Sequence, residues 1–136
     1  MHLVDVNYAA VILSAAAAMI LGSVWYSPIL FGKAWMNLIN KTKDELRETN
    51  TPKTYLVTFI SELIIAFVLY HIMIFSKAAS FTDGLLTGFW LWLGFVATTS
   101  IINFMFEGRK LKQYFIDTFY HLVSLLLMGG IISFWI

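Results

Sequence analysis

Four long apolar runs separated by short polar segments dominate the pattern of the sequence. They lie at about residues 6–25, 53–75, 84–106 and 113–136. A run of about 20 residues is long enough for an α-helix to cross a hydrocarbon core of roughly 30 Å. The pattern therefore predicts an all-α integral membrane protein with four transmembrane helices in a single membrane domain, residues 1–136.

Between the first and second runs, the apolar positions follow the period of an amphipathic helix. Ser27-Pro28 is typical of a helix start, because serine caps free backbone N–H groups and proline suits the first helical position. The apolar face consists of Phe31, Ala34, Trp35, Leu38 and Ile39. We therefore predict an interfacial helix at about residues 28–41, lying along the membrane surface.

Small residues recur at a spacing of four in two of the runs. The first run carries them at Ala10, Ser14, Ala18 and Gly22, and the third begins with Gly84 and Gly88. Such ridges of small side chains let helices approach closely in a membrane. Because a bundle of this size has little interior, the ridges lead us to expect a homo-oligomer.

Composition excludes several other classes of protein. The chain of 136 residues is 60% hydrophobic and 12% charged, which does not suit an ordinary soluble domain. It has no cysteine, so thiol redox chemistry and thiolate metal sites are excluded. No glycine-rich phosphate loop follows a strand, and the basic residues flank the membrane runs, so we expect no nucleotide cofactor and no nucleic acid partner.

Basic residues predict the orientation of the chain. Five lie between the first and second runs and three between the third and fourth, whereas only Lys77 lies on the other side. Residues 1–7 contain His2 and Asp5 but no lysine or arginine, so the first run lacks the basic start of a cleaved signal peptide. By the positive-inside rule, both termini should lie outside the cytoplasm. Tyr8, Tyr70 and Trp135 would then mark the outer membrane interface.

Three ionisable residues lie inside the predicted spans, and they are the strongest chemical signal in the sequence. Glu62 is in the second span, and Asp117 and His121 are one helical turn apart in the fourth. Burial of such groups in a bilayer is costly, so they usually face the bundle interior and find partners. One histidine with two carboxylates from separate helices is a weak metal-binding set, and we predict no metal site.

The other spans offer polar or amphipathic groups at the same depth. Asn103 lies near the end of the third span, and Trp25 and Tyr26 end the first. Together with Glu62, Asp117 and His121, these residues form a candidate ligand-binding site in the cytoplasmic half of the bundle. A structural alternative remains open, because buried polar groups also satisfy one another to fix helix packing.

The corner after the first span carries a resemblance to a known family. Its residues are Trp25-Tyr26-Ser27-Pro28 and Phe31-Gly32-Lys33-Ala34-Trp35, and Asn7-Tyr8 and Gly22 in the first run accompany them. They resemble the signature of a bacterial family of small membrane proteins catalogued as domain of unknown function 1761. The resemblance implies four spans and a location in the bacterial inner membrane, and it assigns no catalytic residues.

Two functions follow as expectations. The first is a binding or transport-like protein, in which Glu62, Asp117 and His121 change protonation as a small, amphiphilic ligand or lipid enters from the cytoplasmic side. The alternative is a structural or accessory membrane subunit, whose polar cluster only sets helix packing. An enzyme acting on lipid would need a nucleophile or a metal, and the sequence offers neither convincingly.

Overall fold

The structure is a computed structural model that describes residues 4–136, so His2 lies outside the described part. In that part the chain forms helices in the order α1 (Tyr8–Trp25), α2 (Gly32–Ile39), α3 (Lys43–Thr49), α4 (Pro52–Phe75), α5 (Phe81–Leu91), η1 (Trp92–Ala97), α6 (Thr98–Glu107) and α7 (Leu111–Ser133). The segments α5, η1 and α6 make one continuous helix. Among the described residues, α1, α4, this composite helix and α7 are long and apolar enough to cross a membrane. The predicted all-α class with four spans is confirmed.

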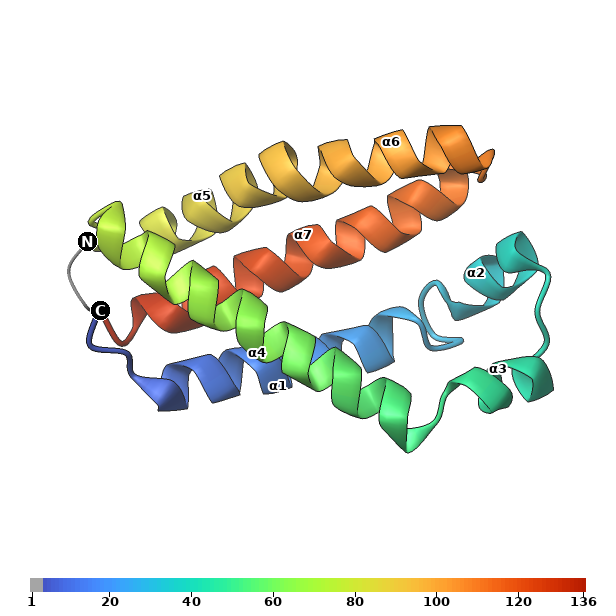
Figure 1. Cartoon of the computed structure of the whole chain (residues 1–136), viewed down its shortest axis with the longest axis horizontal. Coiled ribbons are helices and arrows are strands. Elements are labelled where there is room, and N and C mark those ends of the chain that lie inside the picture. The colour runs from blue at the N-terminus through green and yellow to red at the C-terminus, as the bar shows by residue number, and fades with distance from the viewer. Residues whose placement is uncertain (1–3) are drawn as a thin grey trace.

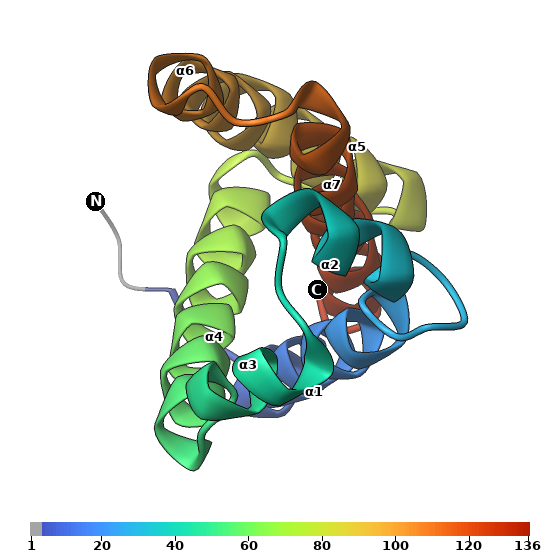
Figure 2. The same ribbon diagram turned by 90° about the vertical axis from the view of Figure 1, so that its right-hand side faces the viewer.

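The four long helices pack as two pairs, α5 with α7 and α1 with α4, and contacts between α1 and α7 join the pairs. Helix α5 runs along α7, and α1 packs against both α4 and α7 (Figure 1). The start of α1 and the end of α7 share one end of the bundle, which we call the C-terminal end. Helices α2 and α3 lie at the opposite end, called the α3 end, where α2 contacts α7 (Figure 2).

Two helix starts follow the local sequence signals. The Thr51 hydroxyl accepts a hydrogen bond from the Thr54 backbone N–H at 3.3 Å, and Pro52 is the first residue of α4. The Thr42 hydroxyl likewise accepts from the Glu45 N–H and caps α3. Each side chain satisfies a backbone donor that the helix itself leaves free, which explains why these helices begin where they do.

The predicted start of the interfacial helix at Pro28 is wrong, because α2 begins at Gly32. The Ser27 hydroxyl donates to the Val24 carbonyl at 2.6 Å and so completes the end of α1. The N–H groups of Leu30 and Gly32 both bond to the Ser27 carbonyl, at 3.1 and 2.9 Å. Pro28 therefore occupies the second position of a tight turn, where its fixed φ is also favourable.

The ridges of small residues pack against other helices of the same chain. Ala10, Ser14 and Ala18 of α1 are fully buried within the bundle. On α5, Gly84 lies against the backbone of Gly129 in α7, and Gly88 lies against that of Leu125. Because these contacts already account for both ridges, the ridges give no support to the homo-oligomer that we predicted from them.

A π-helical turn, η1, interrupts the third span and was not predicted. Such wide turns leave backbone carbonyls that other groups can bond. The Tyr114 hydroxyl donates to the Ala97 carbonyl at 2.8 Å, and the Trp92 indole N–H donates to the Thr118 carbonyl at 2.8 Å. In one bond α7 supplies the donor, and in the other the third span supplies it. Together the two bonds hold the third span and α7 in one position relative to each other.

Candidate functional site

The end of α1 is attached to α7 by two aromatic side chains. The Tyr26 hydroxyl donates to Oδ1 of Asp117 at 2.7 Å. The indole N–H of Trp25 donates to the Ile116 backbone carbonyl at 3.0 Å. The corner motif that the sequence presents is thus a polar contact between the first and fourth spans, at the α3 end of the bundle.

Tyr120 of α7 joins this contact to α4. Its hydroxyl lies 3.0 Å from the Ala18 carbonyl of α1 and 3.3 Å from Oε1 of Glu62 in α4. Its ring packs edge-on against that of Tyr26, with centroids 5.7 Å apart. We call Tyr26, Glu62, Asp117 and Tyr120 the tyrosine–carboxyl cluster, which connects three of the four spans.

The number of hydrogen bonds that the Tyr120 hydroxyl can donate and accept depends on whether Glu62 is protonated. A phenol has one hydrogen to donate, and the Ala18 carbonyl can only accept. If Tyr120 donates to that carbonyl, the shorter of its two contacts, its oxygen is free to accept. A protonated Glu62 would then donate to Tyr120, and both contacts would be satisfied. With an ionised Glu62, the two acceptors would share a single hydrogen.

Within the part of the chain that the structure describes, Asp117 has a cationic neighbour and Glu62 has none. Arg109 lies 4.0 Å from Oδ2 of Asp117 and 3.2 Å from Glu107, and its guanidinium group stacks over the Phe104 ring.

Burial, together with the nearby carboxyl group of Asp117, raises the pKa of Tyr26 well above its usual range. Tyr26 therefore stays protonated at neutral pH and acts as a donor.

Four of the six predicted site residues come together. Trp25 and Tyr26 contact α7 and Glu62 contacts Tyr120, while Asp117 accepts from Tyr26. This grouping matches the predicted meeting of the first, second and fourth spans at one depth. Whether the grouped residues bind a ligand stays a prediction.

Asn103 and His121 stay outside the cluster. Asn103 is exposed on α6, because the face of α6 that meets the bundle carries Phe104 instead. Within residues 4–136, His121 forms no hydrogen bond or ion pair with Asp117, although the predicted spacing of four would allow one. Its ring lies beside that of Tyr120, with centroids 5.0 Å apart.

Sequence reasoning missed Tyr120 and Arg109. Tyr120 lies three residues after Asp117, so both were on one helix face, and that spacing was the available signal. Arg109 was interpreted only as a determinant of orientation. No group of three or more possible metal ligands occurs in the described chain.

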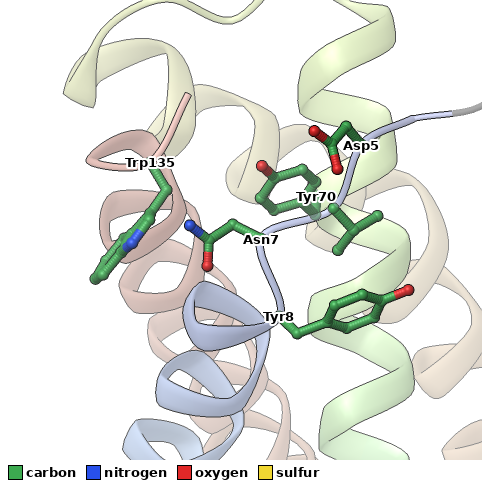
Figure 3. A pocket seen from close by; sticks show the side chains of 6 residues that line it. Asp5, Asn7, Tyr8, Tyr70 and Trp135 are labelled. Carbon is green, nitrogen blue, oxygen red and sulfur yellow. The ribbon is translucent and has the colours of Figure 1, made fainter.

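An open hollow lies at the C-terminal end, away from the cluster. Its volume is about 470 Å³, and its lining comes from residues 5–8 at the start of α1, from α4 and from the C-terminus (Figure 3). The lining includes Tyr8, Tyr70 and Trp135, the three aromatic residues predicted to mark the outer interface. Sequence reasoning did not predict a hollow at this end.

One family matches almost the whole chain. The model described as Protein of unknown function (DUF1761) covers residues 9–133. The chain belongs to this family. The DUF1761 match includes the whole cluster and the corner motif, but it leaves out Asn7-Tyr8. No curated protein and no solved structure matches the chain.

Replacing Tyr26 by phenylalanine should lower the free energy of unfolding by about 1–2 kcal/mol, since the hydrogen bond to Asp117 is lost while the ring remains. The folded pKa of Tyr26 is raised above the unfolded value of about 10, so this contribution is complete below pH 10 and decreases above it. Unfolding in detergent at pH 8 and pH 10.5 measures both effects. The exposed Tyr55→Phe is the control. Equal losses in the two variants would contradict the assignment.

Proposed function

We propose that this DUF1761 member is a binding or transport-like membrane protein whose site is the tyrosine–carboxyl cluster. The observation that carries the proposal is the position of Glu62. It lies in the middle of a spanning helix and is 5% exposed, and among the described residues no cation lies within 4.0 Å of it. A carboxyl group placed in a membrane without a basic partner is costly, and such groups usually serve ions, protons or ligands.

The surroundings of the cluster support an amphiphilic cation as ligand. A third aromatic residue, Trp35, packs beside the two tyrosines of the cluster. Its ring centroid lies 5.3 Å from that of Tyr26. The indole N–H of Trp35 is buried and has no hydrogen-bond partner, so the polar groups beside the cluster are not all used. Aromatic faces with two carboxyl groups attract cations that carry apolar substituents.

A second candidate, the structural or accessory subunit, is favoured by a different observation. The hydroxyl groups of Tyr26 and Tyr120 and the indole of Trp25 all have partners within the chain. A cluster that only fixes helix packing needs no more than this. The two candidates differ in whether the cluster binds a ligand and changes protonation as it does so.

For the location, we propose the bacterial inner membrane with both termini outside the cytoplasm. The basic residues support this orientation, and it would put the cluster in the cytoplasmic half of the membrane. The chain has no cysteine, so single cysteines introduced at Ser80 and at Glu48 can be labelled selectively. An impermeant maleimide added to intact cells should label the variant at Ser80 and not the variant at Glu48. The reverse pattern would overturn the orientation.

The ligand proposal is tested with tetraphenylphosphonium and the purified chain in detergent. We expect binding to strengthen between pH 6 and pH 8.5, because the cation competes with a proton at the cluster, and addition of the cation should release protons into a weakly buffered solution. Calorimetry and a pH electrode measure the two effects. Glu62→Gln should remove the pH dependence, and Asp117→Asn should weaken binding.

The control for both substitutions is Asp44→Asn, an exposed carboxylate of α3. It should leave binding and proton release unchanged. If tetraphenylphosphonium binds at neither pH, or if Glu62→Gln binds with unchanged pH dependence, the proposal is wrong. Altered stability of Glu62→Gln and Asp117→Asn in the absence of any binding would instead favour the structural candidate.

A further inference from the structure

The hollow at the C-terminal end is a second polar site, separate from the cluster. Tyr70 and Glu62 are eight residues apart on α4, which is about 12 Å along the helix axis. Figure 3 shows side chains from three parts of the chain gathered around the hollow. The lining residues are Asp5, Val6, Asn7, Tyr8, Tyr70 and Trp135.

The lining has the chemistry of a cation site. Among residues 4–136, Asp5 is the one charged side chain that lines the hollow, and no lysine, arginine or histidine of that part lines it. Three aromatic side chains also line the hollow, and the surface that faces it is mainly polar. Oδ1 of Asn7 accepts from the N–H groups of Ala9 and Ala10, at 3.0 and 3.4 Å. Since Asn7 already bonds these donors of α1, the helix start does not offer them to an anion.

The volume of the hollow and its position at the end of the spans restrict the kinds of ligand that it could bind. A volume of about 470 Å³ lies in the range of small-molecule sites and exceeds what a single ion needs. The hollow lies where α1 begins and α7 ends, so it is at the end of the membrane spans. Tyrosine and tryptophan gather there at the depth of lipid headgroups. An ammonium group at this depth can be part of a lipid.

We propose that this hollow binds an ammonium group, carried by a zwitterionic lipid headgroup or by a free amine of the same chemistry. Asp5 supplies the opposite charge. Tyr8 and Trp135, which are both exposed, and the buried Tyr70 supply aromatic contacts. The proposal does not depend on the function of the tyrosine–carboxyl cluster, because no residue belongs to both sites.

The test compares two lipids with identical acyl chains bound to the full chain in maltoside detergent. Native mass spectrometry should show phosphatidylethanolamine retained about tenfold more than phosphatidylglycerol. Asp5→Asn should remove that preference, and Tyr8→Ala should reduce it severalfold. The matched controls are Asp44→Asn and Tyr55→Ala, which change exposed residues of the same types elsewhere. Thermal unfolding of each variant checks that the fold is kept.

A second arm separates the two sources of the ammonium group. Millimolar ethanolamine is titrated into delipidated protein, and binding is followed by calorimetry. Lipid preference that depends on Asp5 supports a headgroup as ligand, and Asp5-dependent binding of ethanolamine without lipid preference supports a free amine. If Asp5→Asn changes neither lipid retention nor ethanolamine binding, the proposal is overturned.

Discussion

Gly84→Ala is expected to lower the free energy of unfolding by about 3 kcal/mol, at the upper end of the cost of overpacking. A Cβ atom at Gly84 would collide with the carbonyl oxygen of Gly129 and would lie 2.8 Å from its carbonyl carbon. Both are backbone atoms of α7, so no side-chain rotation relieves the collision. The helices α5 and α7 would have to separate, and the third span would lose its main packing partner.

The same substitution at Gly94 provides the control. A Cβ atom at Gly94 meets nothing within 4 Å, because that glycine is exposed in the π-helical turn. Alanine is favoured over glycine inside a helix, so Gly94→Ala should leave stability unchanged or raise it slightly. Unfolding in mixed micelles measures both variants. Equal stability of Gly84→Ala and Gly94→Ala would show that α5 and α7 do not meet closely.

Hydropathy and local chemistry were enough to predict the elements of the fold. The apolar runs gave the four spans within a few residues, because length and composition alone decide whether a helix can cross a membrane. The caps at Thr42 and Thr51 depend only on neighbouring residues, so the local sequence is enough to explain both. The partner of each ridge was not predictable, since Gly129 meets Gly84 only once two distant helices are packed.

Ser27-Pro28 shows where local reasoning fails. Serine followed by proline suits both a helix start and a tight turn, and the choice depends on which carbonyl the serine side chain reaches. Here α1 has just ended, so the Val24 carbonyl lies within 2.6 Å and the hydroxyl donates to it. The geometry of the preceding helix therefore decided the outcome, and α2 began four residues later than predicted.

The candidate site was predicted in part for a similar reason. Tyr26, Glu62 and Asp117 were selected because ionisable or amphipathic groups at one depth tend to meet, and they do so. Asn103 was selected on depth alone, but rotation about the helix axis decides contact, and it faces outward. Tyr120 was overlooked because a tyrosine in an apolar run is usually a packing residue, whereas here its hydroxyl joins α1, α4 and α7.

Tyr120→Phe is expected to lower the free energy of unfolding by about 2–3 kcal/mol, because it leaves the buried carboxyl group of Glu62 without its hydrogen-bond partner. Glu62→Gln should cost less than about 1 kcal/mol, since the amide can still donate to Tyr120. Tyr114→Phe is the control. It removes a single bond to the Ala97 carbonyl and should cost about 1 kcal/mol.

The double variant Tyr120→Phe/Glu62→Leu separates packing from function. Replacing both partners of a buried hydrogen bond by apolar groups of similar shape can restore stability, so the double variant should be more stable than Tyr120→Phe alone. If it is not, the unpartnered carboxyl group is not the cause of the loss. If it is, the bundle folds without the pair, and leucine would serve its packing as well as Glu62 does. A carboxyl group that packing does not need is the one we expect a ligand or a proton to use.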